Sequence, residues 1–142
     1  LAPVVLEVCR QARTVHADQG LDCSATAVTI AGDEDAIRQL IWILLDNATR
    51  HARSRVSVAL AREGAWARLT VADDGPGIPP EQREHVFERF YRSDPARAGG
   101  GAGLGLSIAR WIVEQHAGRL LAGEAAGGGA AMYADLPVLR PS

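Results

Sequence analysis

Four short segments hold most of the side chains in this sequence that could do chemistry. In the first, residues 44–51, Asn47, Arg50 and His51 are spaced by three and four positions, so they share one face of a helix. An amide oxygen and a guanidinium on the same wall suit a magnesium ion and the phosphates that it bridges. The polar edge of a solvated helix has the same pattern, so this segment taken alone leaves both interpretations open.

The second segment, residues 73–78, comes directly after a predicted strand. A carboxylate at the end of a strand, here Asp73, can accept a hydrogen bond from the exocyclic amine of adenine. Gly75 and Gly77 would let the backbone approach a planar base closely. Guanine presents a carbonyl group where adenine has the amine and would be repelled. An ordinary Asp-Gly turn is the alternative interpretation.

The third segment, residues 86–92, contains the only two phenylalanines of the chain, Phe87 and Phe90. We expect them to anchor a mobile loop to the core, while Arg89 and Arg92 extend toward phosphate or a partner. A plain amphipathic turn explains the same pattern nearly as well.

The fourth segment, residues 99–107, is rich in glycine and leads into a predicted helix. Free N–H groups at a helix N-terminus, together with the positive end of the helix dipole, form a cradle for phosphate. No frame of this segment has the glycine spacing of a dinucleotide-binding turn, and the chain contains no lysine, which a Walker-type phosphate loop requires. Two large classes of nucleotide-binding protein are therefore excluded.

The elements that must position these segments follow from the spacing of apolar residues. Helices are predicted over 1–19, after an N-cap at Asp33, and over 104–116, with a short helix near 80–90. Strands are predicted over 25–31, 55–61, 65–71, 119–123 and 130–136, the second and third joined as a hairpin through Glu63-Gly64. This order predicts an α/β (α+β) fold, a two-layer sandwich of three main helices on a mixed, mostly antiparallel five-stranded sheet.

Composition narrows the class of protein. The 142 residues are 47% hydrophobic and 23% charged, which is typical of one soluble globular domain. A formal net charge of -2 provides no electrostatic footprint for nucleic acid or anionic lipid. No apolar run approaches the roughly 20 residues of a membrane-spanning helix. Cys9 and Cys23 match no zinc-site spacing and could form at most one bridge; we predict two buried or partly buried thiols in a reducing compartment.

In this order the four segments, LLDNATRH, DDGPGI, VFERFYR and GAGLGLSIAR, resemble the N, G1, F and G2 boxes of the sensor histidine kinases. The resemblance covers essentially the whole chain and is to the catalytic, ATP-binding domain of those kinases. That domain has the Bergerat-type fold, which is also found in gyrase, the MutL repair protein and the ninety-kilodalton heat-shock chaperone. Four boxes in the same order make the resemblance specific.

The resemblance implies a site for two cofactors, ATP and Mg²⁺. It implies that Asn47 is the magnesium ligand, that Asp73 contacts adenine, and that Arg92 approaches the γ-phosphate. The expected catalytic residues are Asn47, Arg50 and Arg92, and the expected ATP-binding residues are Asn47, Arg50, His51, Asp73, Gly75, Gly77, Ile78, Phe90, Gly101, Gly103, Leu104, Gly105 and Leu106. Gly101, Gly103 and Gly105 would belong to a lid over the nucleotide.

The sequence departs from the family pattern at two positions. Many such kinases have a second Asn four residues before the magnesium ligand, and the ATP-hydrolysing relatives have a water-activating Glu there; this chain has Ile43. The missing carboxylate favours phosphoryl transfer to an outside nucleophile over hydrolysis. Where the family often has Gly-Thr, this chain has Gly129-Ala130, so a water-bridged contact to adenine is expected to be lost.

The phosphate acceptor is expected to lie outside this chain. The family's acceptor histidine is in a separate helical domain, followed by an acidic residue and then by proline, and His16, His51, His85 and His116 lack that context. Residues 1–142 are therefore expected to be one catalytic domain excised from a longer receptor. The expected partners are a histidine-bearing dimerisation domain of the same full-length protein and the receiver domain of a response regulator. No nucleic-acid partner is expected, and the fragment should be monomeric.

Two other functions stay open from the sequence. A gyrase- or MutL-type ATPase module would use ATP to drive dimer closure, and Ile43 argues against it. A degenerate domain that no longer binds nucleotide would serve as an interaction scaffold, and Ile43 and Ala130 are its only support. The usual arrangement of the family that the chain resembles implies a cytoplasmic domain of a full-length protein anchored in the cell membrane.

Overall fold

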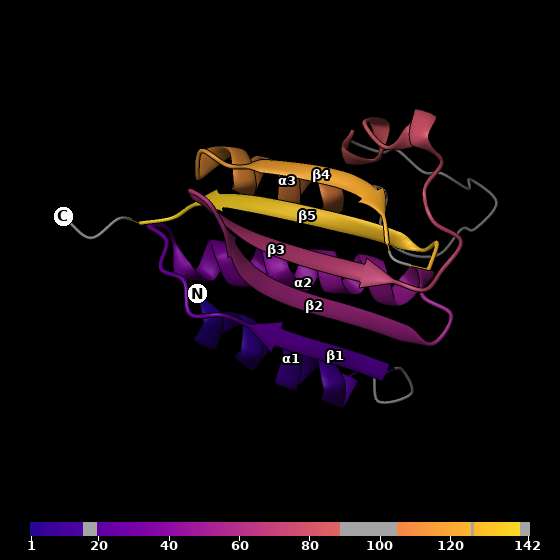
Figure 1. Cartoon of the computed structure of the whole chain (residues 1–142), viewed down its shortest axis with the longest axis horizontal. Helices are drawn as coiled ribbons and strands as arrows, with labels where there is room; N and C mark the ends of the chain where they lie inside the picture. Colours follow the sequence, from indigo (N-terminus) through magenta and orange to yellow (C-terminus); the bar gives the residue numbers. More distant parts are fainter. Residues whose placement is uncertain (16–19, 89–104, 126, 140–142) are drawn as a thin grey trace.

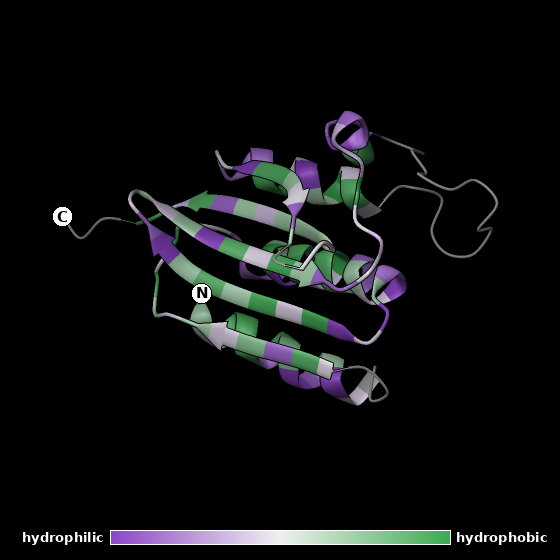
Figure 2. Ribbon diagram, turned by 45° about the vertical axis from the view of Figure 1, so that its right-hand side comes forward, coloured by the Kyte–Doolittle hydropathy of each residue, from purple (hydrophilic) through white to green (hydrophobic). Residues whose placement is uncertain are grey.

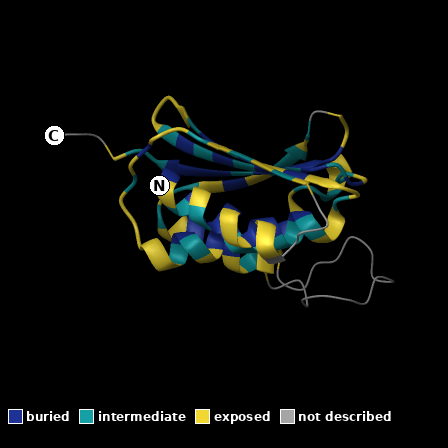
Figure 3. Ribbon diagram, turned by 90° about the horizontal axis from the view of Figure 1, so that it is seen from below, coloured by how far each residue is buried: buried dark blue, intermediate teal, exposed yellow. Residues whose placement is uncertain are grey.

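A computed structural model of the chain describes residues 1–15, 20–88, 105–125 and 127–139. Three helices lie on one face of a five-stranded sheet, as expected (Figures 1 and 3). The helices are α1 (Ala2–Val15), α2 (Glu34–His51) and α3 (Gly105–Gln115), and the strands are β1 (Gly20–Ala25), β2 (Arg55–Glu63), β3 (Trp66–Asp73), β4 (Arg119–Glu124) and β5 (Ala130–Pro137).

The sheet has the strand order β1-β2-β3-β5-β4. β1 pairs with β2 in parallel and the other three pairings are antiparallel, which confirms a mixed, mostly antiparallel sheet. The predicted hairpin joins β2 to β3, and Gly64 in its turn has a φ of 63°, a left-handed conformation that glycine adopts without a steric penalty.

The predicted strand over 25–31 is wrong. The strand at this edge of the sheet is β1, which runs over Gly20–Ala25 and alternates exposed and half-buried residues. The small and β-branched residues of 25–31 favoured a strand there. Pairing with β2 instead uses Gly20–Ala25, whose alternate side chains can turn toward α1. Within 26–31 only Ile30 makes a bridge, to Val138.

The prediction of two free thiols is also wrong, because Cys9 and Cys23 form a disulfide with their Cα atoms 6.7 Å apart. Cys9 is fully buried on the apolar stripe of α1, and Cys23 lies on the half-buried side of β1. Packing of α1 against β1 therefore brings the two side chains together, which their spacing in the sequence did not indicate.

The short helix expected near 80–90 is replaced by two single turns of 3₁₀ helix, η1 (Pro80–Gln82) and η2 (His85–Phe87). η1 is closed by hydrogen bonds from the Gln82 N–H to the Pro79 carbonyl and from the Arg83 N–H to the Pro80 carbonyl, and η2 by one from the Glu88 N–H to the His85 carbonyl. The second turn ends at Glu88, where the backbone is extended with a ψ of 145°.

The core lies between the helices and the sheet (Figures 2 and 3). Asp33 caps α2 as predicted, accepting a hydrogen bond from the Asp35 N–H at 3.0 Å. The apolar face of α2 is buried as predicted, through Ile37, Leu40, Ile41, Leu44, Leu45 and Ala48. From the sheet, alternate residues of β2 and β3 fill the same layer.

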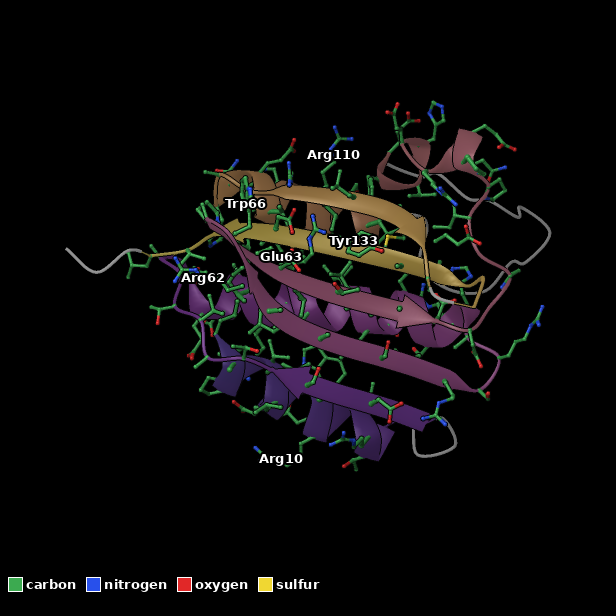
Figure 4. All side chains as sticks on the ribbon, in the orientation of Figure 1. Arg10, Arg62, Glu63, Trp66, Arg110 and Tyr133 are labelled. Atoms are coloured by element: carbon green, nitrogen blue, oxygen red, sulfur yellow. A yellow bond between two sulfur atoms is a disulfide. The ribbon has the colours of Figure 1, made fainter. Side chains whose placement is uncertain are left out.

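No helix of the described residues covers the opposite face of the sheet, where a polar cluster lies beside Trp66 and Tyr133 (Figure 4). Arg68 and Arg119 both bind the fully buried carboxylate of Asp135, each with an Nε–Oδ distance of 2.8 Å. Arg68 lies over the ring of Tyr133 and Arg119 over the ring of Trp66, with guanidinium carbons 5.1 and 4.9 Å from the ring centres. The two cations therefore compensate the cost of burying this carboxylate, and the two aromatic rings contact those cations.

Candidate nucleotide-binding site

Asp73 is the last residue of β3 and is 8% exposed. Its Oδ1 accepts hydrogen bonds from the N–H groups of Gly75 at 2.8 Å and of Ala130 at 3.4 Å. None of the residues that the structure describes donates to Oδ2. The carboxylate is thus oriented through one oxygen, and its second oxygen stays available as an acceptor at the end of the strand.

Three chain segments approach one another around Asp73, and glycines make this approach possible. A Cβ at Gly75 would overlap the carbonyl oxygen of His51, and a Cβ at Gly129 would overlap the carbonyl oxygen of Asp73. Gly77 has a φ of 80° and lies against the backbone of the turn between β4 and β5. The end of α2, the turn after β3 and the turn before β5 therefore form one compact backbone surface.

The predicted residues of α2 lie in its last turns, which lead to this surface, but they differ in their contacts. Asn47 is half-buried, and no hydrogen bond of its side chain is found among the described residues. Arg50 pairs with Asp46, one turn earlier, with 2.5 Å between Nη2 and Oδ2. His51 is exposed, and its carbonyl group is the part that touches the turn after β3.

The other predicted residues within the described chain belong to neighbouring segments. Ile78 is half-buried against the core, and its carbonyl accepts a hydrogen bond from Arg83 Nε at 3.1 Å. Gly105 begins α3, and Leu106 packs partly against the core. Phe90, Arg92, Gly101, Gly103 and Leu104 lie outside the described residues.

The two positions that depart from the family pattern are both packed within the fold, Ile43 partly against the core and Ala130 buried at the start of β5. A Cβ at Gly105 would lie 3.5 Å from Cγ2 of Ile43, so Ile43 packs beneath the start of α3. Ala130 lacks a hydroxyl group but its backbone N–H still bonds Asp73. Phe87, 6% exposed, anchors η2 to the core as the third segment predicted.

Asp74 also shapes the backbone at this end of the sheet, although the sequence did not indicate it. Its carboxylate accepts hydrogen bonds from the backbone of the connection between α2 and β2. Bonds from the backbone N–H and the hydroxyl of Ser54 hold the pKa of Asp74 far below the ordinary range of a carboxyl group. An acidic residue beside Asp73 was the only signal available, and it looked like part of an ordinary Asp-Gly turn.

Two kinds of feature are not found in the part of the chain that the structure describes. No three His, Cys, Asp or Glu side chains there are grouped so that they could hold a metal ion. No helix there is both long and apolar enough to cross a membrane.

Comparison with known proteins agrees with this geometry. Residues 32–140 match the family of histidine kinase-, DNA gyrase B- and HSP90-like ATPases. The chain is 39% identical to the signal transduction histidine-protein kinase BaeS of Escherichia coli K12 over 118 residues, 80% of this chain and 25% of BaeS. It is 38% identical to the histidine-protein kinase/phosphatase MprB of Mycolicibacterium smegmatis over 144 residues, 99% of this chain and 29% of MprB. The chain therefore spans less than a third of these relatives.

Solved structures have the same fold. A mycobacterial sensor histidine kinase MprB superposes with a TM-score of 0.84 at 33% identity, covering 99% of this chain and 95% of that one. The histidine kinase domain of the E. coli osmosensor EnvZ superposes with a TM-score of 0.74 at 33% identity, covering 100% of this chain and 88% of that one. The chain belongs to the family of histidine kinase-, DNA gyrase B- and HSP90-like ATPases, as an ATP-binding catalytic domain of the sensor histidine kinase type.

Proposed function

We propose that this domain binds Mg-ATP and presents the γ-phosphate to a histidine on a dimerisation domain of the same full-length protein, for relay to a response regulator. The domain would do so in the cytoplasm, as part of a sensor anchored in the membrane. The observation that carries the proposal is the geometry of Asp73, a carboxylate held by one oxygen at the end of β3.

Recognition of adenine follows from the second oxygen of Asp73. This oxygen can accept a hydrogen bond from the exocyclic amine of adenine, whereas the carbonyl group of guanine would face it with a second acceptor. The close backbone approaches at Gly75 and Gly129 keep side chains out of the space beside the carboxylate. A flat base could therefore lie against backbone there.

Magnesium fits the residues of α2 through oxygen donors. Mg²⁺ keeps several waters and takes one or two protein oxygens together with substrate phosphates, so it does not require a cluster of carboxylates. The half-buried amide of Asn47, without a hydrogen bond to the described residues, supplies one such oxygen. Asn47 would hold the ion against the phosphates, and the ion would neutralise their charge.

Transfer would depend on positioning and on charge neutralisation, because phosphoryl transfer requires little covalent chemistry from the protein. Arg50 and Arg92 are the proposed cationic contributors, and Arg50 would have to exchange its pairing with Asp46 for phosphate. Ile43 places an alkyl group under α3 where hydrolysing relatives have a water-activating carboxylate. The nucleophile would therefore come from outside the domain, and the chain should not label itself with radioactive phosphate.

The proposal is tested by calorimetric titration of the chain with ATP and with GTP, each with and without magnesium. We expect magnesium-sensitive binding of ATP that GTP does not match. Asp73→Asn replaces an acceptor oxygen by a donor amide and should weaken ATP binding at least about tenfold. Equal binding of ATP and GTP, or unchanged ATP binding by a folded Asp73→Asn variant, would contradict the assignment.

A further inference from the structure

The connection between α2 and β2 is only three residues long, and one carboxylate holds it. Asp74 Oδ1 accepts hydrogen bonds from the backbone N–H groups of Arg53 at 2.7 Å and Ser54 at 3.0 Å. Asp74 Oδ2 accepts from the Ser54 hydroxyl at 2.8 Å. The Asp74 N–H in turn donates to the Arg55 carbonyl at 3.2 Å. Consecutive donors of one short connection thus converge on a single side chain.

This connection joins the two halves of the candidate site. On one side α2 carries Asn47 and ends at His51, and the next residue, Ala52, still donates its N–H to the Ala48 carbonyl at 2.8 Å. On the other side Asp74 directly follows Asp73 at the end of β3. In Figure 1 the loop from α2 to β2 and the end of β3 lie at the same end of the sheet.

A carboxylate suits these contacts. Its two oxygens accept from two backbone N–H groups and a hydroxyl at once, and its charge strengthens each of these hydrogen bonds. An Asn side chain could keep the contacts of Oδ1 and donate to the Ser54 hydroxyl, but it would lose the charge and the second N–H contact to Oδ2. The described residues form no ion pair with Asp74 at salt-bridge distance. Its contacts are therefore hydrogen bonds that shape the backbone, and they leave Asp73 free for a different contact.

We propose that Asp74 is a positioning residue for Mg-ATP, which fixes the end of α2 relative to the end of β3. The proposal rests on the proposed function, in which Asp73 contacts the base and Asn47 lies on the magnesium and phosphate side. Mg-ATP would contact the end of α2 and the end of β3 at once, so its binding requires a fixed distance between these two ends. A ligand that contacts only the Asp73 end does not require that distance. Loss of Asp74 should therefore weaken Mg-ATP and spare adenosine.

The test compares two ligands on the same chain, Mg-ATP by calorimetry and adenosine by NMR shift titration. Asp74→Ala should raise the Kd for Mg-ATP about tenfold or more, because several hydrogen bonds to a charged group are lost. The Kd for adenosine should change less than about twofold. Ser54→Ala removes the hydroxyl donor and keeps both backbone donors, so it should raise the Kd for Mg-ATP only about two- to threefold.

Asp22→Ala is the matched control. Asp22 pairs with Arg55 Nη2 at 2.6 Å, beside the same connection, but it holds a side chain and not the backbone. It should leave both affinities unchanged. If Asp74→Ala does not fold, Asp74→Asn keeps one acceptor oxygen and should show a smaller loss with the same preference for weakening Mg-ATP.

Two results would overturn the positioning role. One is an equal loss of adenosine and Mg-ATP affinity in Asp74→Ala, which would indicate general damage to the site. The other is Mg-ATP affinity equal to that of Asp22→Ala. If the unaltered chain bound neither ligand, the proposed function itself would fail, and the role of Asp74 would fail with it.

Discussion

At the scale of the residue, neighbouring positions with the same side chain make different contacts. Asp73 is oriented by the N–H groups of Gly75 and Ala130, while Asp74 accepts from Arg53 and Ser54. The sequence indicated the first of these carboxylates because an Asp at a strand end before glycines has a recognisable chemistry. It could not indicate the second, because the donors of Asp74 are some twenty residues away in the chain.

The glycine at position 75 provides a test at this scale. A Cβ added there would overlap the carbonyl oxygen of His51, which is backbone and cannot rotate away. Gly75→Ala should separate α2 from the turn after β3, weaken ATP binding at least about tenfold and cost about 2–3 kcal/mol of unfolding free energy.

Gly20→Ala is the control for this substitution, because a Cβ at Gly20 would meet atoms only at 3.6 Å, an ordinary contact distance. Its unfolding free energy, measured by urea denaturation, should stay within about 0.5 kcal/mol of the original chain. Equal stability and ATP affinity of the two variants would contradict the close approach at Gly75.

At the scale of the element, α1 and β1 are held at the edge of the sheet by a covalent link. β1 pairs with β2 on one side only, and the Cys9–Cys23 disulfide ties it to the helix behind it. Arg13 adds hydrogen bonds from Nε and Nη2 to the Leu21 carbonyl. This edge therefore depends on contacts between segments that are separate in the sequence.

Reduction of the disulfide should destabilise the chain. A bridge across a separation of 14 residues removes loop entropy from the unfolded chain, worth about 3 kcal/mol. We expect dithiothreitol to lower the urea midpoint by a corresponding amount. The double variant Cys9→Ala/Cys23→Ala should already have the lower midpoint and should not respond to dithiothreitol. An unchanged midpoint on reduction would contradict a stabilising bridge.

At the scale of the whole molecule, the sheet separates two regions with different roles. The helical face holds the apolar core and the other face holds the Asp135 cluster, while the candidate site lies at one end, where α2, β3 and the turn before β5 meet. Burial raises the pKa of Asp135, but hydrogen bonds from Arg68 and Arg119 outweigh this effect and hold its pKa below the ordinary value.

The stability of the molecule should therefore fall in acid. Asp74 and Asp135 both have lowered pKa values in the folded chain, so the unfolded chain, with Asp near a pKa of about 3.9, binds more protons as the pH falls. Their stabilisation is complete above the unfolded pKa and is lost as the pH drops through the folded values. Urea midpoints at pH 7, 5, 4 and 3 should stay level and then decrease below about pH 4.

Asp135→Asn provides the comparison for this pH dependence. It lacks the carboxylate that both arginines bind, so its midpoint should be lower at pH 7 and should decrease less on acidification. A midpoint that rises as the pH falls, or an acid response identical to that of the original chain, would contradict the role of this cluster.

The sequence by itself determined the features that depend on neighbouring residues. Apolar spacing identified α1, α2, α3 and four of the five strands, and four motifs in order identified the family. These features are local, since the period of a helix or strand and the chemistry of a short motif are contained in adjacent positions.

Only the tertiary structure decided which distant residues meet. It placed β1 over Gly20–Ala25 in parallel with β2, joined Cys9 to Cys23, and brought Asp135 to two arginines. It also placed Asp74 on the connection after α2. The physical reason is that these contacts depend on how helices and strands pack against one another, and many alternative partners in the chain have equally suitable side chains.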